Sequence, residues 1–130
     1  MADAPAPPQG SPAIRVSTMP ADANAYGDIF GGWLVGQMDL AAGLVASRRA
    51  RGRAVTIAMD GIQFLAPVFV GDEVSVYADL RKVGRTSMII DVQAWRRDRT
   101  GEAMEKVTEA CFTFVAIDEA RRPRPVDASA

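Results

Sequence analysis

The feature that most constrains the fold is a helix pattern with almost no polar face. Across residues 30–49, apolar side chains recur at helical spacing, and nearly every position between residues 34 and 45 is apolar or small. A surface helix in an ordinary globular protein keeps one face polar. The sequence therefore predicts a helix that protein surrounds on all sides. Three arginines near its end suit the negative end of the helix dipole, and Gly52 is the expected stop.

Alternating segments on either side of the helix predict a sheet. Four stretches alternate apolar and polar residues with a period of two: 55–64, 74–80, 88–96 and 107–117. Gly61 is expected to form a bulge in the first of them, and residues 14–19 form a possible short edge strand. One long helix with an antiparallel sheet long enough to curl around it is an α+β layout.

The predicted sheet is too broad for one helix to cover, so the fold needs a partner. An uncovered sheet edge invites pairing with another chain. The helix also carries small residues that would let another element approach closely: Gly36, Ala42, Gly43 and Ala46. We therefore expect a second copy of the chain to complete the sheet edge and the helix flank, as a homo-oligomer.

The two ends of the chain differ in composition from its middle. Residues 1–13 are rich in Pro and Ala and are predicted to form a disordered arm. Residues 14–118 are predicted to form one domain, as expected for a chain of 130 residues. Residues 119–130, with three arginines and two prolines, are predicted to form an irregular tail. The first residues lack the basic start and apolar stretch of a signal peptide.

Charge and cysteine content argue against several classes of function. The chain has 15 basic and 16 acidic residues, so it lacks the basic surface on which nucleic-acid binding depends. No apolar run approaches the roughly 20 residues of a membrane span. The single cysteine, Cys111, cannot form a disulfide within the chain, which fits a reducing cytoplasm. We expect a cytoplasmic protein that binds neither nucleic acid nor membrane.

The absence of histidine narrows the possible chemistry most. Without histidine the chain has no Ser-His-Asp or Cys-His catalysis and no His-ligated zinc. No phosphate-binding loop, dinucleotide fingerprint or metal-ligand cluster appears in the sequence. An enzyme of this composition takes its proton chemistry from carboxylates, lysine, tyrosine or bound water.

Asp39 is the first candidate for such chemistry. It lies in the middle of the apolar helix, and no Lys or Arg stands three or four residues away to pair with it. A buried carboxylate is costly unless it is paired or hydrogen-bonded. Two interpretations of Asp39 follow. In the structural one, its carboxylate lies at a solvated gap or accepts a hydrogen bond from a backbone amide. In the functional one, it is a base in a partly dry cleft.

The start of the helix is the second candidate site. Gly31 and Gly32 expose backbone N–H groups at the positive end of the helix dipole, where a carbonyl oxygen that gains negative charge would be stabilised. Asn24 can add a side-chain amide donor. The alternative is that the two glycines form only a flexible junction between loop and helix.

The spacing of these two candidates has a consequence for assembly. Eight residues separate Gly31 from Asp39, which is about 12 Å along a helix at ~1.5 Å per residue. Gly31 and Asp39 of the same subunit are therefore too far apart to contact one carbonyl group together. If two helices run antiparallel across a dimer interface, Asp39 of one subunit can face the helix start of the other. This hypothesis predicts an obligate dimer with paired sites.

A third candidate combines cations with hydroxyl groups between two predicted strands. Residues 81–87 hold Arg81, Lys82, Arg85, Thr86 and Ser87 around a turn glycine. Arg and Lys recognise phosphate groups, and Ser and Thr add donors, so the segment suits a nucleotide phosphate. The alternative is a solvated hairpin with cations on its rim.

These residues belong to a longer pattern that resembles a known family. The run from residue 22 to residue 34, continued by Gln37, Met38 and Asp39, is similar to the signature of YciA-type bacterial acyl-CoA thioesterases. Shorter matches follow in order: Val55-Thr56, Phe64, Pro67, Val70-Gly71-Asp72, residues 82–87 and residues 112–116. The resemblance covers residues 14–125.

The resemblance implies a hotdog fold, in which a curved antiparallel sheet wraps one long central helix. It implies dimers, commonly assembled as a trimer of dimers, and hydrolysis of acyl-CoA without a metal or organic cofactor, as part of fatty acid metabolism. By position, Asp39 matches the family's catalytic acid. The thioester carbonyl would be bound by Asn24, Gly31 and Gly32, and the CoA nucleotide by Arg85, Thr86 and Ser87 with Lys82 beside them.

Two other functions are compatible with such a fold. Hotdog hydratases and dehydratases usually depend on a histidine, which this chain lacks. A non-catalytic acyl-CoA sensor would keep the fold and the nucleotide site. A pure binding protein, however, gains nothing from an unpaired carboxylate in an apolar helix. We therefore expect an acyl-CoA thioesterase.

Overall fold

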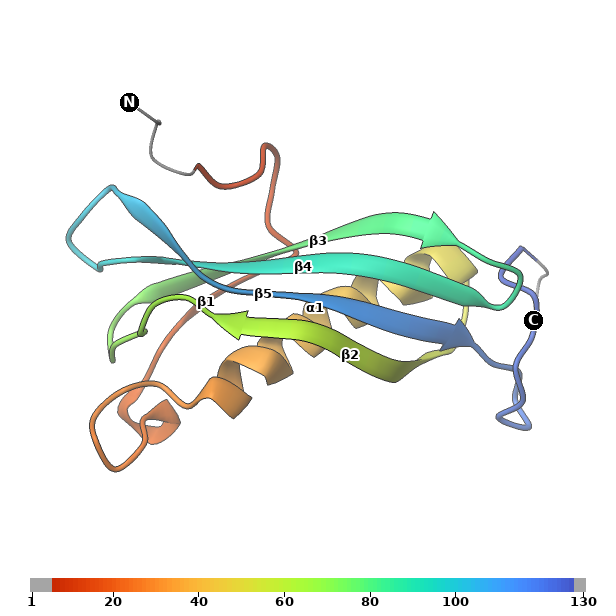
Figure 1. The fold of residues 1–130 in the computed structure, drawn as a ribbon, viewed down its shortest axis with the longest axis horizontal. Coiled ribbons are helices and arrows are strands. Elements are labelled where there is room, and N and C mark those ends of the chain that lie inside the picture. The colour runs from red at the N-terminus through yellow and green to blue at the C-terminus, as the bar shows by residue number, and fades with distance from the viewer. Residues whose placement is uncertain (1–5, 128–130) are drawn as a thin grey trace.

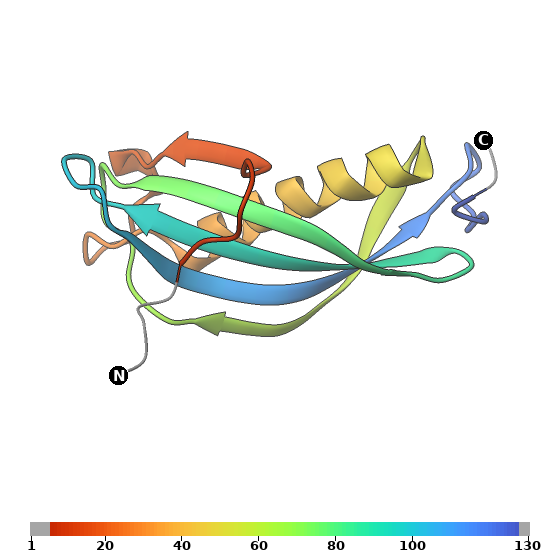
Figure 2. The same ribbon diagram turned by 90° about the horizontal axis from the view of Figure 1, so that it is seen from above.

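One long helix lies along one face of a five-stranded antiparallel sheet (Figures 1 and 2). A computed structural model describes residues 6–127. Its elements are, in chain order, β1 (Ile14–Ser17), the short 3₁₀ helix η1 (Pro20–Asp22), α1 (Gly31–Ala50), β2 (Ala54–Phe64), β3 (Glu73–Val83), β4 (Ser87–Arg97) and β5 (Met104–Ala116). The sheet order is β1-β3-β4-β5-β2. The predicted α+β hotdog fold is confirmed.

The core lies between α1 and the inner face of the sheet. Met38, Ala41 and Ala46 of α1 are fully buried, and Phe112 and Ile90 face them from the central strands. The small alanines bring the helix close to the sheet, while the period-two pattern of each strand turns large side chains inward. The spacing that predicted the helix is therefore the spacing of its buried face.

In a single subunit, α1 is not surrounded on all sides as predicted. Leu40 is 59% exposed and Leu44 is 52% exposed, and both lie on the face that points away from the sheet. Next to the helix, the edge strand β2 exposes Ile57 and Met59 as well. A helix flank and a neighbouring strand edge that are both apolar form the kind of surface that a partner covers.

The predicted end of the helix was wrong by one residue. Ala50 is buried, so the helix continues through it, and Arg51 takes the left-handed conformation with φ of 52°. The Arg51 N–H donates to the carbonyl of Ser47. Gly52 was expected at this reversal because glycine adopts positive φ at least cost. The predicted bulge at Gly61 is confirmed, because its φ is 62° and the pairing of β2 with β5 shifts between Asp60 and Gln63.

The chain on either side of the sheet contains no further helix or strand within the described residues. Residues 6–13 are irregular, and residues 1–5 of the predicted disordered arm lie outside the described residues. The tail forms turns after β5, but it is packed rather than loose, since Arg124 and Val126 are buried. Its last three residues, 128–130, are not described. No helix within residues 6–127 is long and apolar enough to cross a membrane.

Candidate active site

Asp39 projects from the flank of α1 toward β2 and is half-buried. The hydroxyl of Thr56 on β2 donates a hydrogen bond to its Oδ1 at 2.6 Å. Within residues 6–127, no Lys or Arg forms an ion pair with Asp39. One carboxylate oxygen is therefore oriented by a hydroxyl donor, and the other is left for a substrate or a water molecule.

Thr56 is a site residue that sequence reasoning missed. Its register partner on β5 is the buried Phe114, so its side chain points inward to the helix. The sequence shows only a threonine between two apolar residues in a strand. Its contact with Asp39, seventeen residues away in the chain, arises from the packing of β2 against α1.

Asn24 organises the loop that leads into α1. Its side-chain Oδ1 accepts hydrogen bonds from the backbone N–H groups of Tyr26 at 2.8 Å and Asp28 at 3.1 Å. Its own backbone N–H donates to the Asp28 carbonyl at 2.7 Å. Because the oxygen is held by the loop, the side-chain NH₂ group is the end of Asn24 that remains to bind another acceptor.

The start of α1 presents free backbone donors. Phe30 is the N-cap and offers no side-chain cap, and within residues 6–127 the N–H groups of Gly31 and Gly32 have no acceptor. The Phe64 ring packs over Gly31 so closely that a Cβ there would lie 3.1 Å from it. A Cβ on Gly32 would meet nothing within 4 Å. A side chain at Gly31 would therefore require the Phe64 ring to shift by a few tenths of an ångström, whereas Gly32 leaves its N–H open to an approaching ligand.

A cavity of about 440 Å³ connects Asn24 with the helix start. Asn24 and Gly31 line it, and apolar residues form most of the remaining wall: Ile29, Leu34, Phe64, Leu65, Ala66, Pro67 and Val68. Neither Asp39 nor Gly32 lines this cavity. One subunit therefore brings Asn24 and Gly31 together but leaves Asp39 apart, in agreement with the helical distance.

Asp72 holds the segment that follows Pro67 and Val68 of the cavity wall. Asp72 is 4% exposed, accepts the Phe69 N–H at 2.9 Å, and pairs with Arg96 at 3.1 Å. The Arg96 guanidinium also stands 5.4 Å from the centre of the Phe69 ring. The hydrogen bond to the Glu105 carboxylate is the main cause that raises the pKa of Arg96, and the Asp72 carboxylate raises this pKa further. This pair of a buried carboxylate with a half-buried guanidinium fixes the segment that follows Pro67 and Val68.

The predicted nucleotide-binding residues lie at the turn between β3 and β4. Lys82 and Arg85 are exposed, and Thr86 and Ser87 are half-buried. The Gly84 N–H donates to the Ser87 carbonyl at 2.8 Å, and a Cβ on Gly84 would lie 2.8 Å from the Ser87 hydroxyl. Figure 1 shows this turn at the opposite end of the subunit from the start of α1. One subunit therefore separates these cations from Asn24.

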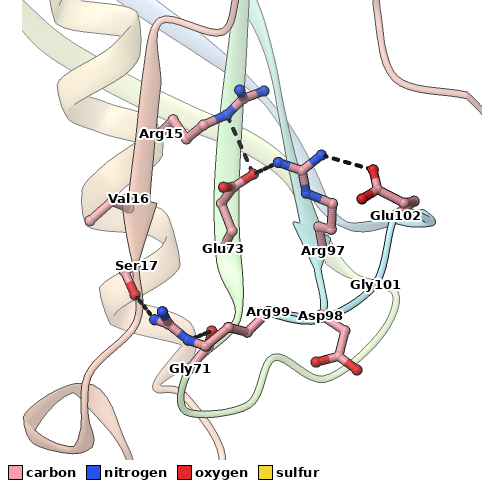
Figure 3. A pocket seen from close by; sticks show the side chains of 10 residues that line it. All are labelled: Arg15, Val16, Ser17, Gly71, Glu73, Arg97, Asp98, Arg99, Gly101 and Glu102. Atoms are coloured by element: carbon pink, nitrogen blue, oxygen red, sulfur yellow. Dashed lines mark hydrogen bonds and ion pairs between the residues drawn. The ribbon is translucent and has the colours of Figure 1, made fainter.

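A second cavity, of about 390 Å³, lies at the other edge of the sheet and is lined by charged residues (Figure 3). Arg15 and Arg97 both pair with Glu73, at 3.5 and 2.6 Å. Arg99 donates to the Ser17 hydroxyl and to the Gly71 carbonyl. Because its cations are engaged by protein acceptors and it lies apart from Asp39, we assign it no catalytic role. Within residues 6–127, no group of three acidic or thiol side chains could hold a metal ion.

Comparisons with known proteins agree with this fold. The thioesterase superfamily matches residues 26–103. An uncharacterized acyl-CoA thioester hydrolase of Zymomonas mobilis is 60% identical over 92% of this chain and 80% of its own. The acyl-CoA thioester hydrolase YciA of Salmonella typhimurium is 46% identical over 92% of each chain. A hexameric thioesterase from Yersinia pestis has a TM-score of 0.88 and 45% identity, covering 94% of this chain and 99% of that one.

The single helix on an antiparallel sheet and these matches define a hotdog-fold thioesterase. More narrowly, the chain belongs to the family of YciA-type acyl-CoA thioester hydrolases. The predicted family and fold are therefore confirmed. The individual roles of Asp39, Asn24, Gly31 and Gly32 remain predictions, as does the nucleotide site.

Proposed function

We propose that the chain hydrolyses the thioester of acyl-CoA to a free carboxylic acid and CoA, with Asp39 at the reaction centre. The observation that carries this proposal is a half-buried carboxylate that Thr56 orients and that has no cation partner among the described residues 6–127, in a chain of the acyl-CoA thioester hydrolase family. As a general base, Asp39 takes a proton from water, the resulting hydroxide attacks the carbonyl carbon, and the C–S bond breaks. The proton then returns to the departing CoA thiolate. As a nucleophile, Asp39 attacks the carbonyl carbon, the C–S bond breaks, and CoA thiolate leaves a mixed anhydride behind. Water then cleaves the anhydride, which releases the acid, regenerates the Asp39 carboxylate and supplies the proton that the thiolate takes up.

The complete site is proposed to form between two subunits. Asn24 and the N–H groups of Gly31 and Gly32 bind the thioester oxygen, and Asp39 of the partner subunit faces the carbonyl carbon. The distance along α1 supports this arrangement, since it keeps the two groups of one subunit apart. The exposed Leu40 and Leu44 on the helix supply an apolar surface on which an antiparallel helix can pack.

An antiparallel dimer also accounts for the position of the nucleotide site. The turn with Lys82, Arg85, Thr86 and Ser87 lies far from Asn24 in one subunit, and a two-fold axis near the middle of α1 moves the partner's turn toward it. Arg85 and Lys82 then bind the phosphates of CoA, with the two hydroxyl groups as further donors. Because the Yersinia pestis relative is hexameric, we further propose a trimer of dimers.

The proposed chemistry uses only protein groups and water, so we propose no metal or organic cofactor. CoA enters as part of the substrate and leaves as product. A cytoplasmic location is proposed from the single cysteine and the CoA substrate. Because the positive and negative charges of the chain nearly balance, we do not propose nucleic acid as a partner.

The direct test of the activity is a thiol-release assay with acetyl-, butyryl-, hexanoyl- and palmitoyl-CoA. The proposal expects release of one thiol for each acid formed, without added metal and in the presence of a chelator. Binding of acyl-CoA by folded protein without thiol release from any of the four esters would instead identify an acyl-CoA sensor.

Loss of the Thr56 hydroxyl is expected to impair turnover more than stability. In a Thr56→Val variant, Asp39 loses the donor that orients its carboxylate, and we expect kcat to fall about tenfold. The matched control is Thr113→Val, which changes a half-buried threonine on β5. Steady-state thiol release measures the turnover of the two variants. Equal rates for the two variants would show that the Thr56 contact has no part in the reaction.

A further inference from the structure

The segment after β5 is fastened to the turn between β3 and β4. The Ala116 N–H donates to the Thr86 carbonyl at 2.9 Å, and the Val126 N–H donates to the Arg85 carbonyl at 2.9 Å. Val126 is 3% exposed and belongs to the hydrophobic core. The turn that presents the Arg85 side chain is therefore held through its backbone by the last residue of β5 and by Val126, which the sequence indicated only as part of an irregular tail.

Arg124 anchors this segment to the end of α1. Its side chain is almost completely buried, and the residue is 6% exposed. The guanidinium donates to the carbonyls of Ala50 at 2.8 Å, Pro125 at 3.0 Å and Ile117 at 3.3 Å. Ala50 is the last residue of α1, so its carbonyl lacks a partner within the helix. A guanidinium at this end is also favoured by the helix dipole.

The connection runs without a break from the helix end to the turn. Arg124 fixes Pro125, and the next residue, Val126, holds the Arg85 carbonyl. Asp127 then pairs with Arg49 of α1 at 2.8 Å. Figure 1 shows the helix end, the turn and the C-terminal segment side by side at one end of the subunit. Arg85 itself is exposed, so nothing in its own side-chain packing sets its direction.

We propose that Arg124 is a positioning residue for the CoA nucleotide, which it orders by holding residues 125–126 against the turn that carries Arg85. This inference rests on the proposed nucleotide site. A cation whose backbone is fixed before the ligand arrives loses less conformational entropy on binding, so the phosphates bind more tightly. Arg124 does not touch the substrate, and its effect passes through the Arg85 backbone.

The experiment compares acyl-CoA with the matching acyl-N-acetylcysteamine thioester, which has the same thioester but no nucleotide. We expect an Arg124→Met variant to raise KM for butyryl-CoA about five- to tenfold, with kcat within about twofold of wild type. The KM for butyryl-N-acetylcysteamine should stay within about twofold, because that substrate never reaches the turn. The matched control is Arg122→Met, which replaces an exposed arginine of the same tail. It should leave KM unchanged for both substrates.

A purely structural role of Arg124 would lower kcat for both substrates alike, and that result would overturn the inference. If Arg124→Met does not fold, Arg124→Lys serves instead. The three donors of an ammonium group sit on one nitrogen and do not reproduce the planar fork that reaches three separate carbonyls, so a smaller rise in KM confined to butyryl-CoA is expected. Arg85→Ala separates this inference from the proposed nucleotide site. An unchanged KM for butyryl-CoA in Arg85→Ala overturns the nucleotide site and the inference together. If KM for butyryl-CoA rises in Arg85→Ala but not in the Arg124 variant, the inference is overturned and the nucleotide site stands.

Discussion

Replacing Asp39 with asparagine is expected to lower kcat for acyl-CoA by at least about a thousandfold while the fold stays intact. The amide is nearly the same size and still accepts the Thr56 hydrogen bond, so the packing of α1 on β2 is preserved. It can neither accept a proton from water nor attack a carbonyl, and both proposed routes therefore stop. Thiol release and thermal unfolding measure the two properties separately.

The control for this substitution is Asp60→Asn, which removes one negative charge from an exposed position on β2. Its turnover should stay within about twofold of wild type. An Asp39→Asn enzyme that retained near-normal turnover would remove Asp39 from the reaction, and another carboxylate would have to be sought.

Charged residues on the exposed face of α1 are expected to separate the subunits and to abolish activity. Leu40 and Leu44 expose more than half of their surface in one subunit, and burial of that remaining surface against a partner stabilises the dimer by roughly 1–1.5 kcal/mol for each residue. A Leu40→Lys, Leu44→Lys double variant loses this stabilisation and would bury two unpaired ammonium groups from each subunit. We expect a folded monomer with at least about a hundredfold lower kcat/KM.

Light scattering after size exclusion measures the mass of this variant, and thiol release measures its activity. The control is Met19→Lys, which adds a charge at an exposed apolar residue outside α1, between β1 and η1. A monomeric double variant that kept wild-type activity would contradict a site shared between subunits. A variant that remained an inactive dimer would show that the helix face is not the interface.

The fold could be predicted largely from periodicity. The helical spacing of Leu34, Met38 and Ala42 and the alternation of the four long strands follow directly from which side chains face the core. The exact helix end could not be predicted in this way, because it depends on the burial of Ala50 rather than on the preference of Gly52. Local preference was outweighed there by tertiary packing.

The candidate site could be predicted only in part. Asp39 stood out because a carboxylate in an apolar helix needs an explanation, and Asn24 and Gly31 because they flank a bare helix start. Thr56 could not be predicted, since its importance depends on which residue of α1 lies opposite β2. The packed tail was also missed: Arg124 looks like a solvated charge in a sequence, and three backbone carbonyls make its burial favourable.

The most direct test of the shared site is subunit complementation between two inactive variants. Asp39→Asn and Asn24→Ala subunits, carrying different affinity tags, are coexpressed at equal levels and assayed together. In a mixed dimer, one site combines Asn24 from the first subunit with Asp39 from the second and is intact, while the other site carries both changes. Random pairing makes half of the dimers mixed, so the account predicts recovery of about a quarter of wild-type activity.

The matched control coexpresses the Asp39→Asn subunit with a subunit that carries both substitutions, which leaves no intact site in any dimer and should give no recovery. Recovery of about a quarter in the first pair and none in the control would establish that Asp39 acts on a substrate bound by Asn24 of the other subunit. Mixed dimers that form, as shown by tandem purification on both tags, yet remain inactive would contradict the shared site.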